Sequence, residues 1–152
     1  MRFDFIRKKE FHLKKGNIGQ FSYFENHPLL IDYNENIVET FINSKPEHID
    51  VFISDFKKSI EAITEGWRSW TSYVENKDSN LTIETFLSNV NNGTGKILEA
   101  PFTINQKVVA VCDLHNVSTV TFGKELERNN FSLIFIGDNY VIAKDFRRHY
   151  EK

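Results

Sequence analysis

Residues 44–66 read SKPEHIDVFISDFKKSIEAITEG, and this stretch decides the fold class that the sequence predicts. Ser44 can cap the free amides of a helix, Pro46 is tolerated in a first helical turn, and Glu47 can reach back to the cap. The pattern predicts a helix that begins here and that Gly66 ends. Its apolar residues recur at helical spacing and form one core-facing stripe: Ile49, Phe52, Ile53, Phe56, Ile60 and Ile63.

The opposite face of this helix is the surface feature that we single out. Its acidic residues and the two tryptophans that follow them are Glu47, Asp50, Glu61, Glu65, Trp67 and Trp70. Acidic surfaces speed the encounter with basic partners, and tryptophan is over-represented at binding hot spots. We therefore expect these six residues to form a partner-binding site. The alternative is a solvated helix face, partly neutralised by Lys57 and Lys58, with both tryptophans in the core.

The remaining patterns predict a single α+β domain over residues 1–152, in which about three helices pack on an antiparallel sheet. Two further helical patterns fall at residues 34–42 and 83–91. From Lys96 onwards, short runs rich in Val, Ile and Phe predict a C-terminal sheet of four to five strands. The predicted strands are residues 97–104, 108–112, 117–122, 131–136 and 140–146, with a possible N-terminal hairpin from 11–13 and 21–24. Residues 67–74 suit either a strand or a continued helix.

Composition and charge exclude several classes of protein. The chain has 152 residues, 40% of them hydrophobic, and one cysteine, so neither an internal disulfide nor a cysteine-rich zinc site is expected. It carries no secretory signal pattern and no uncharged apolar run of membrane-spanning length. The net charge of −2 argues against a dedicated nucleic-acid or membrane binder. We expect a cytoplasmic protein without a cofactor or a bound metal.

No catalytic motif withstands scrutiny, so we do not expect an enzyme. Residues 93–96, Gly-Thr-Gly-Lys, lack both the earlier glycine and the following Ser or Thr of a phosphate loop, and they predict an ordinary turn. Cys112 and His115 could pair as a nucleophile and its base, but three positions apart on a strand they would point to opposite faces. That spacing favours a buried structural thiol.

Two alternatives to a partner-binding role are open. The first is a nucleic-acid-binding or nucleic-acid-processing protein that uses the basic N-terminal segment together with His12 or His115. Its basic residues are Arg2, Arg7, Lys8, Lys9, Lys14 and Lys15. The second is a subunit that dimerises through an edge strand of the C-terminal sheet.

In its size, its lone Cys112, its acidic helical segment and its lack of catalytic motifs, the chain resembles the immunity proteins of bacterial contact-dependent growth inhibition and other polymorphic toxin systems. The resemblance implies a cytoplasmic inhibitor that binds a cognate toxin domain, often a cationic nuclease. Such a protein covers the active site of the toxin with an acidic, partly aromatic surface. The implied partner is therefore a basic protein, and neither a membrane nor a nucleic acid.

Overall fold

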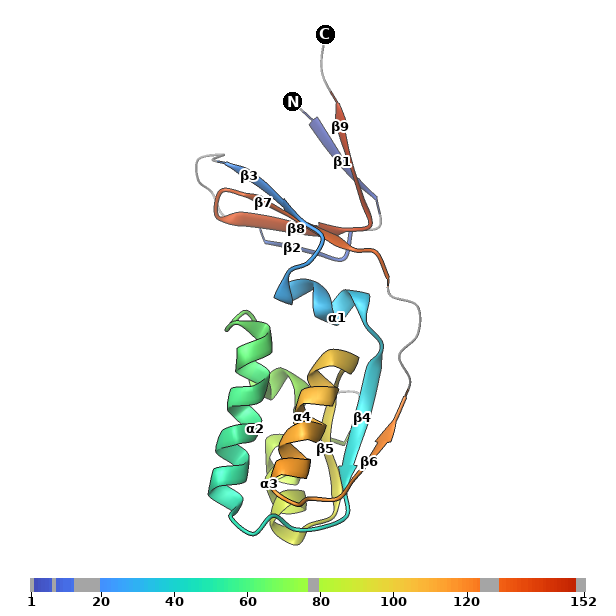
Figure 1. Cartoon of the computed structure of the whole chain (residues 1–152). Coiled ribbons are helices and arrows are strands. Elements are labelled where there is room, and N and C mark those ends of the chain that lie inside the picture. The colour runs from blue at the N-terminus through green and yellow to red at the C-terminus, as the bar shows by residue number, and fades with distance from the viewer. Residues whose placement is uncertain (1, 7, 13–19, 77–79, 124–128, 150–152) are drawn as a thin grey trace. The chain divides into compact units, whose positions relative to one another are not determined.

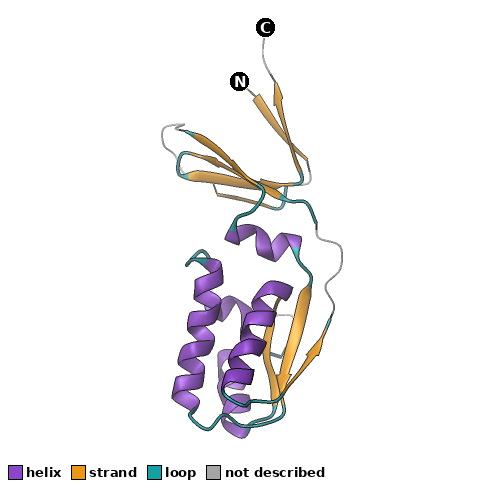
Figure 2. Cartoon of the chain, in the orientation of Figure 1, coloured by secondary structure: helices purple, strands orange, loops and turns teal. Residues whose placement is uncertain are grey.

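A computed structural model of the chain describes residues 2–6, 8–12, 20–76, 80–123 and 129–149 (Figure 1). The chain forms two compact units: unit 1 comprises Met1–Asn34 with Arg128–Lys152, and unit 2 comprises Glu35–Glu127. Figure 2 shows strands in both units and most of the helical structure in unit 2. The predicted α+β class is confirmed.

Unit 2 is built on a three-stranded antiparallel sheet with the strand order β5 (Gly95–Pro101), β4 (Ile37–Ile42), β6 (Thr119–Phe122). Helix α4 (Phe102–Leu114) packs on β4 and β5 and also against α2 (Ile49–Thr64), as Figure 1 shows. Helix α3 (Ile83–Asn92) lies beside β5. The 3₁₀ helix η2 (Trp70–Tyr73) occupies the segment that suited either a strand or a helix. The aromatic centre of the core is Phe52, Phe56 and Phe86, all fully buried.

Helices α2 and α3 confirm two of the predicted helices, but the expected cap of α2 is wrong. Helix α2 begins at Ile49, and its N-cap is His48, which makes no capping hydrogen bond with its side chain. The Ser44 hydroxyl instead accepts a hydrogen bond from the Ser118 amide at 2.7 Å and joins the loop before α2 to the one before β6. At the end of α3, Gly93 adopts a φ of 71°, a left-handed conformation that favours glycine.

The predicted helix over residues 34–42 is wrong, because Ile37–Ile42 form the central strand β4. The side chains of Val38, Thr40 and Ile42 alternate into the core, which is the period of a strand. The polar Thr40 concealed this alternation in the sequence. It is fully buried because its hydroxyl accepts a hydrogen bond from the Asn105 side chain of α4.

The predicted strand over residues 108–112 is also wrong, because this valine-rich segment is the middle of α4. A helix covered by a sheet on one side and by α2 on another can be apolar over much of its surface, so it lacks the polar face of an ordinary surface helix. Its N-terminus is capped from a distant part of the chain. The carboxylate of Glu35 accepts hydrogen bonds from the Thr103 amide at 2.7 Å and from the Thr103 hydroxyl at 2.6 Å.

Unit 1 contains the remaining strands and two short helices, η1 (Pro28–Leu30) and α1 (Ile31–Asn34). A four-stranded antiparallel sheet has the order β2 (Glu10–His12), β8 (Asn139–Ala143), β7 (Ser132–Ile136), β3 (Phe21–Phe24). Strand β1 (Arg2–Ile6) pairs with β9 (Asp145–His149). The buried core of this unit is Leu29, Leu30, Phe131, Leu133 and Ile142.

The sheets of both units differ from the predicted C-terminal meander. The tight turn at residues 137–138 does join β7 and β8 as a hairpin, as predicted. The N-terminal hairpin is wrong, because β2 and β3 lie on opposite edges of the four-stranded sheet and do not pair. Strands β5 and β6 belong to a different sheet from β7 and β8, so the C-terminal residues do not form one sheet of four to five strands.

Candidate functional site

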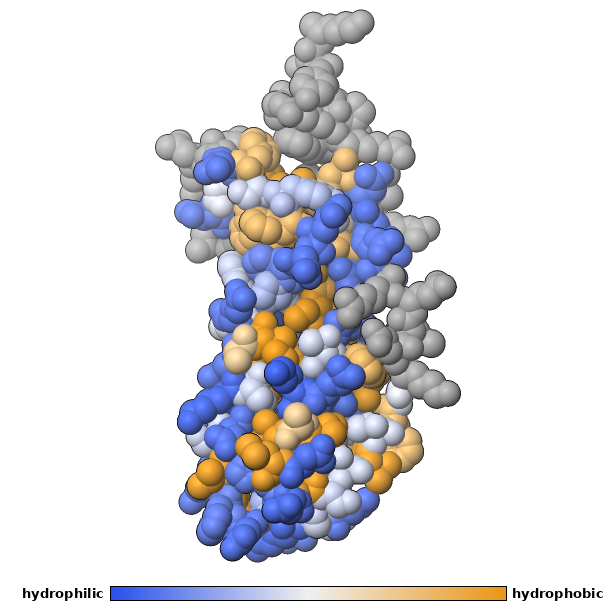
Figure 3. Space-filling model, viewed as in Figure 1, coloured by the Kyte–Doolittle hydropathy of each residue, from blue (hydrophilic) through white to orange (hydrophobic). Residues whose placement is uncertain are grey.

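The four acidic residues of the candidate site divide into two pairs at the two ends of α2. Glu47 and Asp50 lie at its beginning, and Glu61 and Glu65 lie at its end; all four are exposed. Asp50 and Glu61 are 11 residues apart, which corresponds to roughly 16 Å along a helix. Figure 3 shows a mostly hydrophilic outer side of α2 and hydrophobic residues over α4. The sequence correctly placed these acids on an exposed surface, but the structure separates them into two sites.

The C-terminal pair has an unusual setting. Glu61 and Glu65 are one helical turn apart, no basic residue lies in the last turn, and Glu65 is the C-cap with a φ of 49°. Within the described part of the chain, neither carboxylate has an ion-pair partner. The end of a helix carries a partial negative charge, so these carboxylates add to a potential that is already negative. Arg68 is the nearest cation along the chain in the following loop.

The two tryptophans occupy different environments. Trp67 follows Glu65 by two residues and is 43% exposed. Trp70 is half-buried, with its ring centroid 6.4 Å from that of Phe56 and 5.8 Å from that of Phe86, and the Lys57 ammonium lies 4.6 Å from its centre. Trp70 thus packs on the core of unit 2. Its ring also contacts Lys57, one of the two lysines expected to neutralise the acidic face of α2. Trp67 is the more exposed of the two tryptophans and lies just after the end of α2.

The outer face of the unit 2 sheet is a second exposed surface. Exposed apolar side chains on this face are Ile37 (51%), Val120 (41%) and Phe122 (57%). Lys96 hydrogen-bonds Glu39 and lies 3.5 Å from a carboxylate oxygen of Glu99. Burial alone would lower the pKa of the Lys96 ammonium, but the hydrogen bond and charge of Glu39, with the charge of Glu99, raise it above its ordinary value. This cluster is electrostatically paired, unlike Glu61 and Glu65.

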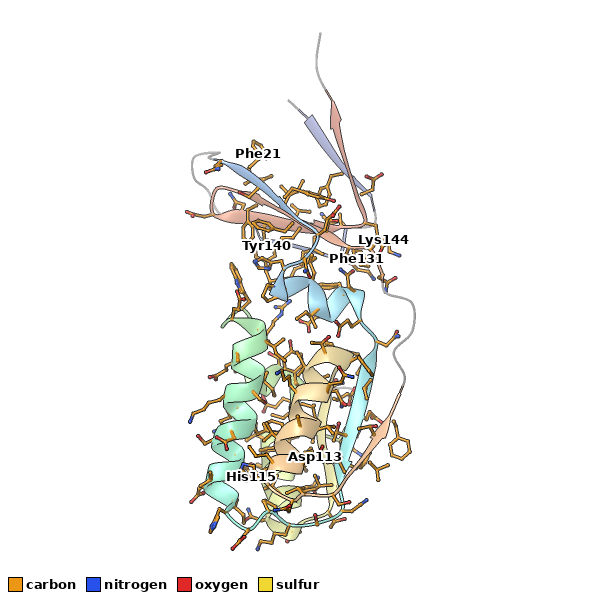
Figure 4. All side chains as sticks on the ribbon, in the orientation of Figure 1. Phe21, Asp113, His115, Phe131, Tyr140 and Lys144 are labelled. Carbon is orange, nitrogen blue, oxygen red and sulfur yellow. The ribbon has the colours of Figure 1, made fainter. Side chains whose placement is uncertain are left out.

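Cys112 and His115 do not form a nucleophile and its base. The thiol is fully buried, and burial, with a contribution from the charge of Asp113, raises its pKa to about 12. His115 Nε2 lies 2.9 Å from Asp55 Oδ2, and Figure 4 shows His115 at the end of α4 beside α2. The prediction of a buried thiol is confirmed, although its basis was a strand and the segment is a helix. Here His115 joins α4 to α2.

Comparisons with known proteins provide no relative for this chain. No protein-family model, no curated protein and no solved structure matches it. Across the described ranges, no three His, Cys, Asp or Glu side chains converge closely enough to hold a metal ion. No described helix has the length and hydrophobicity needed to span a membrane.

A group of residues in unit 1 forms a pocket that no sequence pattern predicted. Lys8 and Lys9 belong to the basic N-terminal segment, and the structure brings them together with Asn129, Phe131 and Lys144 around one pocket. These residues lie more than a hundred positions apart in the sequence, and no local motif links them. The pairing of β1 with β9 and of β2 with β8 brings the two segments together.

Proposed function

We propose that this chain is a protein-binding inhibitor that recognises a basic partner through the C-terminal end of α2. The observation that carries the proposal is the placement of Glu61 and Glu65 at one end of a helix, with the exposed Trp67 two residues after Glu65. A partner with a basic surface would be attracted by the two carboxylates and by the negative end of the helix dipole. Trp67 supplies the large rigid side chain that often anchors such contacts.

The unfavourable energetics of this helix end support a binding role. Carboxylates in the last turn of a helix destabilise it by about 0.3–1 kcal/mol each at an exposed site. A non-glycine residue in the left-handed region adds roughly 1–2 kcal/mol. Glu65 incurs both costs. Residues selected only for folding would avoid this combination, whereas a bound cationic surface would offset it.

The particular inhibitor class that we propose is an immunity protein, which neutralises a cognate basic toxin domain, such as a nuclease, by covering its active site. The acidic, partly aromatic end of α2 matches what the resemblance to such proteins implies. In this proposal the protein works in the cytoplasm, where a reducing environment keeps the lone Cys112 as a thiol. The chain itself performs no chemistry on its partner.

Affinity capture with matched variants tests this function. Tagged wild-type protein should retain one basic protein from the source cells at low salt and less of it at moderate salt, because salt screens exposed charges. The double variant Glu61→Gln/Glu65→Gln should lose this protein. The double variant Glu47→Gln/Asp50→Asn removes the same charge from the other end of α2 and should retain it.

Three results would count against the proposal. Capture that is insensitive to both double variants excludes α2 as the contact. Loss of the partner only in Glu47→Gln/Asp50→Asn places the contact at the wrong end of the helix. A partner that is acidic, or whose activity is unaffected by the bound protein, contradicts inhibition of a basic toxin.

A further inference from the structure

A separate pocket lies in unit 1, with a volume of about 470 Å³. Its lining combines three lysines with an aromatic ring and polar groups: Lys8, Lys9, Tyr33, Asn129, Phe131 and Lys144. The site belongs entirely to unit 1, whereas the acidic end of α2 belongs to unit 2. It therefore requires its own explanation.

Two of the lysines converge on a single buried ring. The ammonium of Lys9 lies 5.8 Å from the centre of the Phe131 ring, and that of Lys144 lies 5.2 Å from it. Lys144 also donates a hydrogen bond to the Asn129 side-chain oxygen at 3.1 Å. Figure 4 shows Phe131 and Lys144 close to each other. Cation–π contacts hold both ammonium groups at the pocket without neutralising their charge.

The frame of the pocket is fixed by hydrogen bonds at its back. The Asn34 side chain donates to the Phe131 carbonyl at 2.9 Å and accepts from the Phe131 amide at 2.7 Å, so it clamps both sides of that residue. The Asn129 amide donates to the Asn34 carbonyl at 3.1 Å. The Lys9 amide donates to the Ile142 carbonyl of β8 at 2.9 Å. The backbone of Lys9, Asn129 and Phe131 is thus held in place.

No carboxylate is among the described residues that line the pocket, although Glu10 and Asp145 follow its lysines in the chain. The two oxygens of Glu10 accept hydrogen bonds from the hydroxyls of Tyr33 and Tyr140. Asp145 accepts a hydrogen bond from the Phe146 amide at 2.8 Å. The described lining therefore contains three cationic side chains and no anionic one.

We propose that this pocket binds the phosphate groups of a ligand that carries two or more of them. Several lysine ammonium groups around a fixed centre suit a multiply charged oxyanion, to which lysine binds as a point charge. The side-chain NH2 group of Asn129 adds a neutral donor. Because Phe131 is only 3% exposed beneath the lysines, its ring is not a platform on which a base could stack. The site recognises phosphate rather than a nucleobase, and the phosphates come either from a small oligophosphate or from a nucleic-acid backbone.

Calorimetric titration with sodium tripolyphosphate, at constant ionic strength set with chloride, tests the site. Wild-type protein should bind it, and the variant Lys9→Gln/Lys144→Gln should bind at least about tenfold more weakly, because even one lost charged contact is worth roughly this factor. The control Lys58→Gln/Lys107→Gln removes two exposed lysines of unit 2 and should bind as the wild type does. Thermal unfolding of each variant verifies that it is folded.

A second titration with a single-stranded RNA 12-mer distinguishes the two sources of phosphate. Tighter binding of the RNA than of tripolyphosphate, with both lost in Lys9→Gln/Lys144→Gln, identifies a nucleic-acid backbone as the ligand. Binding of tripolyphosphate alone identifies a small oligophosphate. The proposal is overturned if tripolyphosphate does not bind at millimolar concentration, or if its binding is equally strong in the folded Lys9→Gln/Lys144→Gln variant.

Discussion

Replacement of Glu65 should make the protein more stable and a weaker binder at the same time. Glu65 ends α2 with a φ of 49° and no basic residue in the preceding turn. Glu65→Gln removes the charge but keeps the strained backbone, so unfolding should cost about 0.3–1 kcal/mol more than in the wild type. Glu65→Asn also relieves part of the roughly 1–2 kcal/mol left-handed penalty, because asparagine tolerates this conformation. We expect a total gain of about 1–2 kcal/mol for Glu65→Asn.

Urea unfolding followed by far-ultraviolet circular dichroism measures these differences. The transition midpoint should rise in the order wild type, Glu65→Gln, Glu65→Asn, with an unchanged dependence on denaturant. Glu61→Gln is the matched control, since it removes a charge one turn earlier in regular helix and should match Glu65→Gln within a few tenths of a kcal/mol. A Glu65→Asn variant that is no more stable than Glu65→Gln would refute the strain argument. Variants less stable than the wild type would refute both parts of it.

Three further predictions concern the fold. Glu35→Ala should lower the free energy of unfolding by about 1–2 kcal/mol, because it removes the cap of α4 at Thr103. The control Glu75→Ala removes an exposed carboxylate and should change this free energy little; equal effects of the two variants in urea unfolding would contradict the capping role of Glu35. Cys112 should resist iodoacetamide at pH 8 until the protein unfolds, because its thiol is buried and its pKa is raised. The stability that this raised pKa contributes is fully present below about pH 8.5 and is lost as the pH rises toward 12, by about 1.4 kcal/mol per pH unit relative to Cys112→Val. Parallel pH profiles of the free energy of unfolding for the wild type and Cys112→Val would contradict this prediction. A single domain predicts one cooperative unfolding transition. Both tryptophans lie in unit 2, so the urea unfolding curve followed by tryptophan fluorescence reports only on that unit, and it should coincide with the curve followed by circular dichroism. Separated midpoints of the two curves would contradict a single domain.

Local patterns were sufficient for the elements whose stabilising contacts are close in sequence. Helix α2 shows its apolar stripe directly, and α3 shows both a threonine cap and a terminal glycine. The β7–β8 hairpin has a turn whose residues accept the required conformation. In each of these cases the residues that define the element lie within it or next to it.

The wrong predictions depend on contacts between distant residues. Strand β4 resembles a helix because its inward-facing Thr40 is polar, and only Asn105, 65 positions later, makes its burial favourable. Helix α4 resembles a strand because it is rich in valine, and its N-terminal cap, Glu35, lies 68 positions before Thr103. Tertiary contacts overrode local propensity at both sites.

The candidate sites were predictable to different degrees. Exposure of Glu61 and Glu65 followed from the helical pattern, but the exposure of Trp67 and the left-handed backbone at Glu65 did not. The pocket around Phe131 and Lys144 could not be found from the sequence, because its lysines converge when β1 pairs with β9 and β2 with β8.

The most direct test of the proposed function is the association rate constant of the captured basic partner with three forms of the protein. We predict that Glu61→Lys/Glu65→Lys associates at least about tenfold more slowly than the wild type at low salt, and that the difference shrinks as salt rises. The control Glu47→Lys/Asp50→Lys should associate at nearly the wild-type rate. Equal rates for the wild type and a folded Glu61→Lys/Glu65→Lys variant would contradict the claim that this end of α2 binds a basic partner.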